Sequence, residues 1–229
     1  MSSTPPVNRH PTAAASGSYS RAAEERVLSD ISHELGNFFH KLYYLTDYLQ
    51  EKRPPASEDT TATEMLGRTI RNLEGFLRVS LEYFRPLALS TIPMSVSDLV
   101  AGLLGQARSE LNGTPLAVAD AGQWNGATLL VDPGRLPSVF VQALRRVVSG
   151  VEHGRVEIAV RAERRGDVDG LEVRVTALTN GAAPAALNTA ADVEWALAER
   201  VVALHGGELV AVEPTGEQRL VVLFLPFHA

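Results

Sequence analysis

The chain has 229 residues, no cysteine and a formal net charge of −6, and 45% of its residues are hydrophobic. This length and apolar content suffice for two modest domains with cores of their own. The absence of cysteine excludes disulfide bonds and thiolate chemistry and fits a reducing cytoplasm, where we expect the protein to reside. Because Lys and Arg do not cluster, nucleic acid is not an expected partner, and no apolar run reaches the ~20 residues of a membrane span.

Residues 1–20 are rich in Ser, Thr, Pro and Ala and lack the apolar stretch of a signal peptide. This composition predicts a disordered tail. The first helix is expected from about Arg21 to Gln50, because Pro54 and Pro55 cannot continue a helix. Its apolar residues alternate at spacings of three and four, which is the a/d pattern of a helical bundle. They are Leu28, Ile31, Leu35, Phe38, Leu42, Leu45 and Leu49.

A second helix, expected from about Thr61 to Phe84, repeats this spacing, with polar Ser80 at one core position. Its apolar stripe consists of Leu66, Ile70, Leu73, Leu77 and Phe84. Two long helices joined by a short loop form an antiparallel hairpin with one apolar face. A lone hairpin leaves that face half uncovered, so we expect a homodimer in which two hairpins form a four-helix bundle.

One polar residue of the first helix is placed for chemistry: His33, in the sequence SHELGN. With Leu28 at position a, His33 falls at position f, farthest from the seam. A water-facing histidine next to Glu34 and one turn before Asn37 can be approached by another protein's reactive group. A surface histidine without a chemical role fits the same position, and the helix alone does not decide between the two interpretations.

Two hydrolytic alternatives fit the sequence poorly. A zinc protease of the HExxH class needs a second imidazole one turn after the first. Here that position holds Asn37, and His40 lies a further turn along. A serine or cysteine hydrolase is not indicated either, because the chain has no cysteine and no GxSxG sequence.

After Pro86 the pattern changes to alternating helices and strands. Helices are expected near 97–109, 134–149 and 191–204, and strands near 116–119, 128–131, 156–161, 171–177, 208–212 and 220–225. The sequences RRGDVDG and EPTGEQ predict hairpin turns. The expected architecture is therefore a helical hairpin over residues 21–90, followed by a mixed α/β sandwich over residues 91–229.

These segments resemble the histidine kinases of two-component signalling along nearly all of the ordered length. SHELGN looks like their H-box, in which the histidine is phosphorylated and the next residue is acidic. VDPGRLPSVFVQALRRV is similar to the helix that carries their N-box, and ERVVALHGGELVAVEPTGEQRLVVLFLP is similar to the segment from the last glycine box to the terminal strand. The resemblance implies a dimerisation and histidine-phosphotransfer hairpin followed by a Bergerat-type ATP-binding α/β sandwich.

The chain departs from this family at the residues that bind nucleotide. An active kinase has asparagines where this chain has Gln142 and Arg146, and the second asparagine holds magnesium, which a guanidinium cannot do. The adenine-binding DxGxG turn should fall at Val175 to Gly181, which reads VTALTNG without a carboxylate. The glycine-rich loop before the last helix is replaced by Asp192-Val193-Glu194. The lid between the two glycine boxes is nearly absent.

These departures decide against ATP chemistry. Two carboxylates within about 5 Å of a triphosphate repel it by ~3 kcal/mol per charge pair at an effective dielectric constant near 20. We therefore expect a degenerate ATPase-like domain that binds neither ATP nor a cofactor of its own. The chain is in this respect similar to the histidine phosphotransferases that are built on a degenerate kinase scaffold.

This resemblance implies a function in a phosphorelay: His33 takes a phosphoryl group from the aspartate of one response-regulator receiver domain and passes it to another. Glu34 would orient the ring, Asn37 would contact the phosphoryl oxygens or position a hydrolytic water, giving receiver phosphatase activity, and the receiver would supply Mg²⁺. The alternative is a non-catalytic dimeric adaptor that binds response regulators, with an inert His33. His205 in LHGG is interpreted as a helix C-terminal residue rather than a second phosphorylation site.

Overall fold

The computed structural model describes residues 13–51, 56–111, 114–120, 126–148, 154–179, 189–215 and 218–228. It divides into two compact units, Met1–Leu73 and Glu74–Ala229. The end of the second helix belongs to the second unit, because it is bound to the α/β part of the chain. Arg135 forms an ion pair with Glu82 at 2.7 Å, and Arg200 donates a hydrogen bond to the backbone oxygen of Tyr83.

Two long helices open the chain, α1 (Ala13–Glu51) and α2 (Ala56–Phe84). Helix α1 begins before the predicted start at Arg21, because residues 13–20 contain three alanines, the strongest helix formers, and no proline. The part of the predicted disordered tail over residues 13–20 is thus helical. The rest of that tail and the predicted turn at Pro54 and Pro55 lie outside the described residues.

The side chains of α1 are buried with the expected heptad period. Those that are buried recur at spacings of seven, four and seven: Val27, Glu34, Phe38 and Leu45. Leu28, which was predicted to lie in the seam, is 50% exposed. The buried stripe therefore includes the residues next to the predicted seam, as is usual for a helix whose apolar face is wider than two heptad positions.

Helix α2 carries two separate stripes rather than the single one that was predicted. The buried stripe contains Ala62, Phe76, Ser80 and Tyr83, and the exposed stripe contains Ile70, Leu77, Leu81 and Phe84. Ser80 is buried, and its hydroxyl keeps a hydrogen bond because it donates to the backbone oxygen of Phe76 at 2.8 Å. A single chain therefore leaves an apolar row on α2 in contact with solvent.

The second unit contains all the predicted helices and strands, with small shifts of their ends. They are α3 (Val96–Leu111), β2 (Leu116–Asp120), β3 (Thr128–Val131), α4 (Leu136–Val148), β4 (Gly154–Arg165), β5 (Val168–Thr179), α5 (Thr189–Leu204), β6 (Glu208–Thr215) and β7 (Gln218–Pro226). One strand was missed, β1 (Ile92–Ser95), which pairs antiparallel with β3. It contains Pro93 and has only four residues, so it shows no clear alternation.

The main sheet has the strand order β2-β4-β5-β7-β6, with β2 parallel to β4 and the other pairs antiparallel. The predicted turn in RRGDVDG is confirmed: Arg165 pairs with Val168 across a tight turn in which Gly166 has a φ of 60°, a conformation that favours glycine. Strands β6 and β7 form the second predicted hairpin, in which Thr215 pairs with Gln218.

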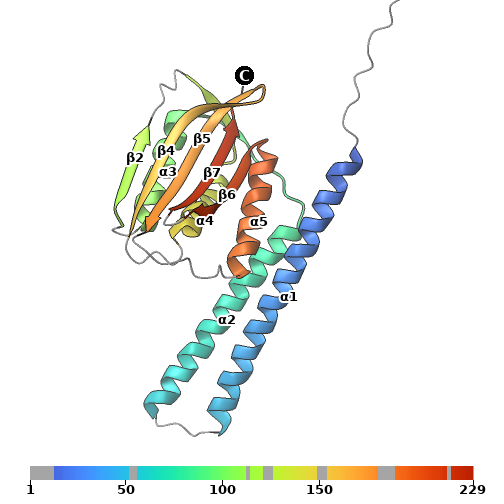
Figure 1. Ribbon diagram of the computed structural model, residues 1–229. Helices are drawn as coiled ribbons and strands as arrows, with labels where there is room; N and C mark the ends of the chain where they lie inside the picture. The colour runs from blue at the N-terminus through green and yellow to red at the C-terminus, as the bar shows by residue number, and fades with distance from the viewer. Residues whose placement is uncertain are drawn as a thin grey trace, which may run out of the picture. The chain divides into compact units, whose positions relative to one another are not determined.

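One face of the sheet packs against α3, α4 and α5, and α3 and α4 lie behind it in Figure 1. Every second residue of β4, β5 and β7 points into this core, for example Ile158, Val173 and Leu223, and Phe140 of α4 is fully buried there. The opposite face is polar around Glu172. This half of the chain is the two-layer α/β sandwich that the sequence predicted.

Candidate functional site

The three predicted site residues lie together on α1. The amide nitrogen of Asn37 is 3.4 Å from Nδ1 of His33 and donates to Oε2 of Glu34 at 3.2 Å. These spacings of four and three residues place the three side chains on adjacent turns of one helix. The helix itself therefore brings the three side chains together, and Glu34 contacts Asn37 rather than the ring that it was expected to orient.

The members of this group differ in their contact with solvent. His33 is exposed, Asn37 is half-buried, and Glu34 is only 5% exposed. A carboxylate that is this well buried needs a hydrogen-bond donor, and the Asn37 amide supplies one. Asn37 thus connects a buried carboxylate to an exposed imidazole.

The orientation of Asn37 determines which nitrogen of His33 carries the proton. Its amide nitrogen has two hydrogens, and one donates to Glu34, which leaves the other for Nδ1 of His33. This arrangement favours the neutral tautomer in which Nδ1 accepts and Nε2 carries the proton. Rotation of the Asn37 amide by about 180° would present its oxygen to Nδ1 and favour the other tautomer.

Two other histidines are alternatives to His33 in the sequence. His40 lies further along α1 and is exposed. His205 follows the last residue of α5: its Nδ1 lies 2.8 Å from the backbone oxygen of Val201, and its Nε2 accepts from the backbone nitrogen of Asp132 at 2.9 Å. Both ring nitrogens of His205 are thus used within the fold, which agrees with the structural role assigned to it.

Helix α4 carries Gln142 and Arg146, which were compared in sequence with the asparagines of an active kinase. Arg146 forms an ion pair with Asp192 of α5 at 3.4 Å, and its guanidinium lies 4.5 Å from the ring centroid of Trp195. Asp192 and Glu194 lie within the first turns of α5 rather than in a loop before it. Arg146 is therefore a cation that is already bound to its neighbours.

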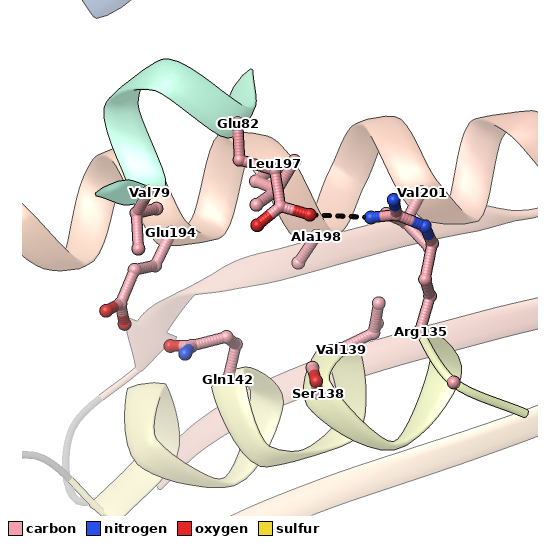
Figure 2. A pocket seen from close by; sticks show the side chains of 11 residues that line it. Val79, Glu82, Arg135, Ser138, Val139, Gln142, Glu194, Leu197, Ala198 and Val201 are labelled. Carbon is pink, nitrogen blue, oxygen red and sulfur yellow. Dashed lines mark hydrogen bonds and ion pairs between the residues drawn. The ribbon is translucent and has the colours of Figure 1, made fainter. Parts of the chain in front are cut away.

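Gln142, the other substituted residue, lines a cavity of about 250 Å³ together with residues of α2, α4 and α5 (Figure 2). The charged residues that line this cavity are Glu82, Arg135 and Glu194. The ion pair between Arg135 and Glu82 bounds one end of the view, and Gln142 and Glu194 lie at the other. Sequence reasoning missed Glu82, because a lone glutamate at a helix end gives no signal.

The start of α4 is fixed by Asp132, which is 6% exposed. Its carboxylate accepts hydrogen bonds from the backbone nitrogens of Ser90 at 2.8 Å, Gly134 at 2.9 Å and Arg135 at 3.2 Å. The bond from Ser90 is the main reason that the pKa of Asp132 is lowered, and those from Gly134 and Arg135 add to it against the effect of burial. An Asp-Pro pair before an apolar helix is a signal for such a cap.

Other predictions about this half fall partly outside the described residues. Val175 to Thr179 of the predicted DxGxG position belong to β5, whereas residues 180–188, which include the shortened lid, are not described. Within the described part of the chain, no group of three or more His, Asp or Glu side chains could hold a metal ion. The same part contains no helix with the length and apolarity needed to cross a membrane.

The chain is similar in structure to several histidine kinases. It matches the histidine kinase AdeS of Acinetobacter baumannii with a TM-score of 0.52 and 12% identity, over 86% of this chain and 98% of that one. It matches ThkA, in a complex with the response regulator protein TrrA, with a TM-score of 0.64 and 12% identity, over 95% and 68% of the two chains. It matches full-length ShkA, in a complex with AMPPNP, with a TM-score of 0.53 and 20% identity, over 90% of this chain and 46% of that one.

No protein-family model and no curated protein matches the sequence. The structural likeness nevertheless extends over both units of the chain. It includes the long α1 and α2 helices as well as the mixed sheet with its three helices. The chain therefore has the fold of the histidine kinases, a helical hairpin followed by an ATPase-like α/β sandwich.

Proposed function

We propose that the protein is a histidine phosphotransferase of a two-component phosphorelay, which carries phosphoryl groups between receiver domains on His33 and does not use ATP. The observation that carries this proposal is the exposed imidazole of His33, joined through Asn37 to the buried carboxylate of Glu34. Such a ring is accessible to a second protein and is positioned by its own helix.

Apart from the Mg²⁺ that the receiver would hold, the transfer requires only groups of the two proteins. The ring reacts in the tautomer that carries its proton on Nδ1, which forms by proton exchange with water, so that the lone pair of Nε2 is free to react. Nε2 attacks the phosphorus of a receiver aspartyl phosphate, the bond from phosphorus to the aspartate oxygen breaks, and the electron pair leaves with the carboxylate. The second transfer reverses these steps on another receiver, and the receiver's own acidic site supplies the Mg²⁺ that offsets the phosphoryl charge.

Glu34 and Asn37 have distinct parts in this scheme. Glu34 holds the amide of Asn37 beside the ring, so it acts as a positioning residue. Asn37 contacts the ring directly and is half-buried, close enough to orient a water for attack on the phosphohistidine or on the receiver. Asn37→Ala should therefore reduce receiver phosphatase activity more than phosphotransfer, as measured by phosphate release beside transfer of label.

The absence of ATP chemistry is part of the proposal. Arg146 brings a positive charge to the position of a magnesium ligand and is held there by Asp192 and Trp195. The adjacent cavity is lined by Glu82, which is paired with Arg135, and by Glu194, whose carboxylate repels phosphates. We expect calorimetry with Mg-ATP to give no binding at millimolar nucleotide, and a micromolar dissociation constant would contradict this part of the proposal.

Response-regulator receiver domains are the proposed partners. ThkA, which has the same fold, was solved in a complex with a response regulator protein. In the present chain, the large side chains of Phe39, Tyr43 and Tyr44 are 50%, 69% and 67% exposed on α1, in the turns that follow His33. Exposed aromatic groups next to a reactive residue are typical of a protein-binding surface.

The proposed active form is a homodimer. Ile70, Leu77, Leu81 and Phe84 of α2 follow one another at spacings of seven, four and three residues and are 40–61% exposed in a single chain. A second hairpin packed on this row would complete a four-helix bundle.

The dimer is tested by placing charge in the exposed row of α2. Leu77→Glu combined with Leu81→Glu should give monomers, since unpaired charges buried in a helical seam cost several kcal/mol. The matched control is Arg78→Glu, a change of an exposed residue between them. Sedimentation at micromolar concentration should give a dimer for the wild type and the control. A monomeric wild type would contradict the assignment.

The phosphotransfer proposal is tested with a panel of radiolabelled phosphoreceiver domains. Wild-type protein should acquire acid-labile label from at least one receiver, and His33→Ala should acquire none. His40→Ala is the matched control, because His40 is also exposed on α1, and it should be labelled like the wild type. Label that remains in His33→Ala would overturn the site, and an unlabelled wild type would favour the adaptor function.

A further inference from the structure

The cavity that lies between α4, α5 and the last turns of α2 has a feature that phosphotransfer does not use. Its walls are apolar in the middle, where Val139 faces Leu197 and Ala198, and polar at both ends (Figure 2). A pocket with an apolar body and a few polar groups is the usual form of a small-molecule site.

The two polar ends of the cavity differ in charge balance. At one end, Arg135 and Glu82 neutralise each other in an ion pair of 2.7 Å. At the other end, the Glu194 carboxylate and the Gln142 amide approach each other from α5 and α4. Glu194 forms no hydrogen bond or ion pair through its side chain with any other described residue. The lining thus carries one negative charge, on Glu194, that has no partner among the described residues.

The described arginines near the cavity are engaged elsewhere. Arg146 is bound to Asp192 and lies over Trp195, and Arg200 donates to the backbone oxygen of Tyr83. A carboxylate beside an apolar, partly enclosed surface gains most from a cation that brings both a charge and apolar area.

We propose that this cavity binds a small organic cation, such as a primary amine with a short apolar body. The ammonium group would donate to the carboxylate of Glu194 and the side-chain oxygen of Gln142. The apolar body would lie along Val139 and Leu197. The volume of about 250 Å³ is just below the ~300–1,000 Å³ of typical ligand pockets, so the ligand is a small one. The proposal goes beyond phosphotransfer and does not depend on it.

The experiment is an NMR titration of the full-length ¹⁵N-labelled protein with benzylamine. The side-chain amide signals of Gln142 and the backbone signal of Glu194 should shift and saturate in the millimolar range or below. Benzyl alcohol and benzoate have the same apolar ring, and they should shift these signals weakly or not at all. Glu194→Gln should weaken benzylamine binding by about tenfold or more, because it removes the charge and keeps the shape.

The control variant is Glu110→Gln, which removes a carboxylate of α3 that pairs with Arg145 and does not line the cavity. It should bind benzylamine like the wild type. The overall spectrum shows whether each variant is folded, so a loss of binding is separated from a loss of structure. Three results would overturn the proposal: no saturable shift with benzylamine, equal binding of benzyl alcohol, or unchanged affinity in Glu194→Gln.

Discussion

The polar groups of α1 and α4 are engaged in different ways. On α1, exposed His33 has a hydrogen bond from Asn37 at one ring nitrogen, and the rest of the ring can be approached by a partner. On α4, Arg146 is held by an ion pair and by an aromatic ring, and the start of the helix is held by Asp132. A polar group that the fold already satisfies contributes to stability, whereas an incompletely satisfied one is available for binding or chemistry. Substitutions of the bound groups on α4 should therefore lower stability, whereas substitution of His33 on α1 should lower activity and leave stability nearly unchanged.

The largest loss of stability is expected from Asp132→Ala. The change removes the acceptor for three backbone nitrogens, those of Ser90, Gly134 and Arg135, at a site that is 6% exposed. The free energy of unfolding in urea should fall by about 2–3 kcal/mol. Asp98→Ala, which removes an exposed carboxylate near the start of α3, is the control and should cost about 1 kcal/mol or less. A loss below that of the control would show that the α4 cap is not tightly held.

The same carboxylate should make stability depend on pH. The pKa of Asp132 is lower in the folded state than the ~3.9 of an unfolded chain. Its contribution is therefore fully present above that unfolded value and is lost as the pH falls through the folded-state pKa. The difference in unfolding free energy between wild type and Asp132→Asn should shrink as the pH falls below about 4. A constant difference between pH 7 and acid would contradict the role of the ionised carboxylate.

A smaller loss is expected from Arg146→Met, which removes the ion pair to Asp192 and the contact with Trp195. The cost should be about 1 kcal/mol in urea unfolding. Arg145→Met on the same helix is the matched control, because its ion pair with Glu110 is more exposed, and it should change stability by less than ~0.5 kcal/mol. Equal effects of the two variants would mean that Arg146 is not specially held.

Substitution of Gly36 tests how closely a partner approaches His33. A methyl group added at Gly36 or at Gly75 of α2 meets no atom within 4 Å, so each change to Ala should stabilise its helix by about 0.5–1 kcal/mol. If a receiver docks closely beside His33, Gly36→Ala should slow phosphotransfer and Gly75→Ala should not. Transfer rates that are equal in the two variants would show that the glycine beside His33 has no part in docking.

The smallest effect on stability should come from His33→Ala. The side chain is exposed and its one hydrogen bond is 3.4 Å long, so the unfolding free energy should change by no more than ~0.5 kcal/mol. A loss above about 1 kcal/mol in urea unfolding would mean that His33 is a structural residue rather than a reactive one.

The sequence predicted most of this structure, and its failures have physical causes. The group of His33, Glu34 and Asn37 was predictable because one helix sets its geometry. The burial of Glu34 was not predictable, because a heptad pattern assigns apolar residues to the seam and does not identify a buried carboxylate.

Contacts between distant segments were the harder part. The pairing of Arg146 with Asp192 joins residues that are far apart in the chain, as does that of Arg135 with Glu82. Neither pair has a local sequence signal, although both follow once α4, α5 and the end of α2 are placed. The sequence pattern also predicted one stripe on α2 where the structure has two. Spacings of three and four residues occur in both stripes and do not distinguish them.

The most direct test of the account compares two phosphoryl donors on the same protein. Radiolabelled Mg-ATP and a panel of radiolabelled phosphoreceivers are incubated separately with wild-type protein, and any label is mapped by proteolysis and mass spectrometry. We predict no label from ATP and acid-labile label on His33 from at least one receiver. Label from ATP, or label from receivers that maps to His40 or His205, would contradict the account.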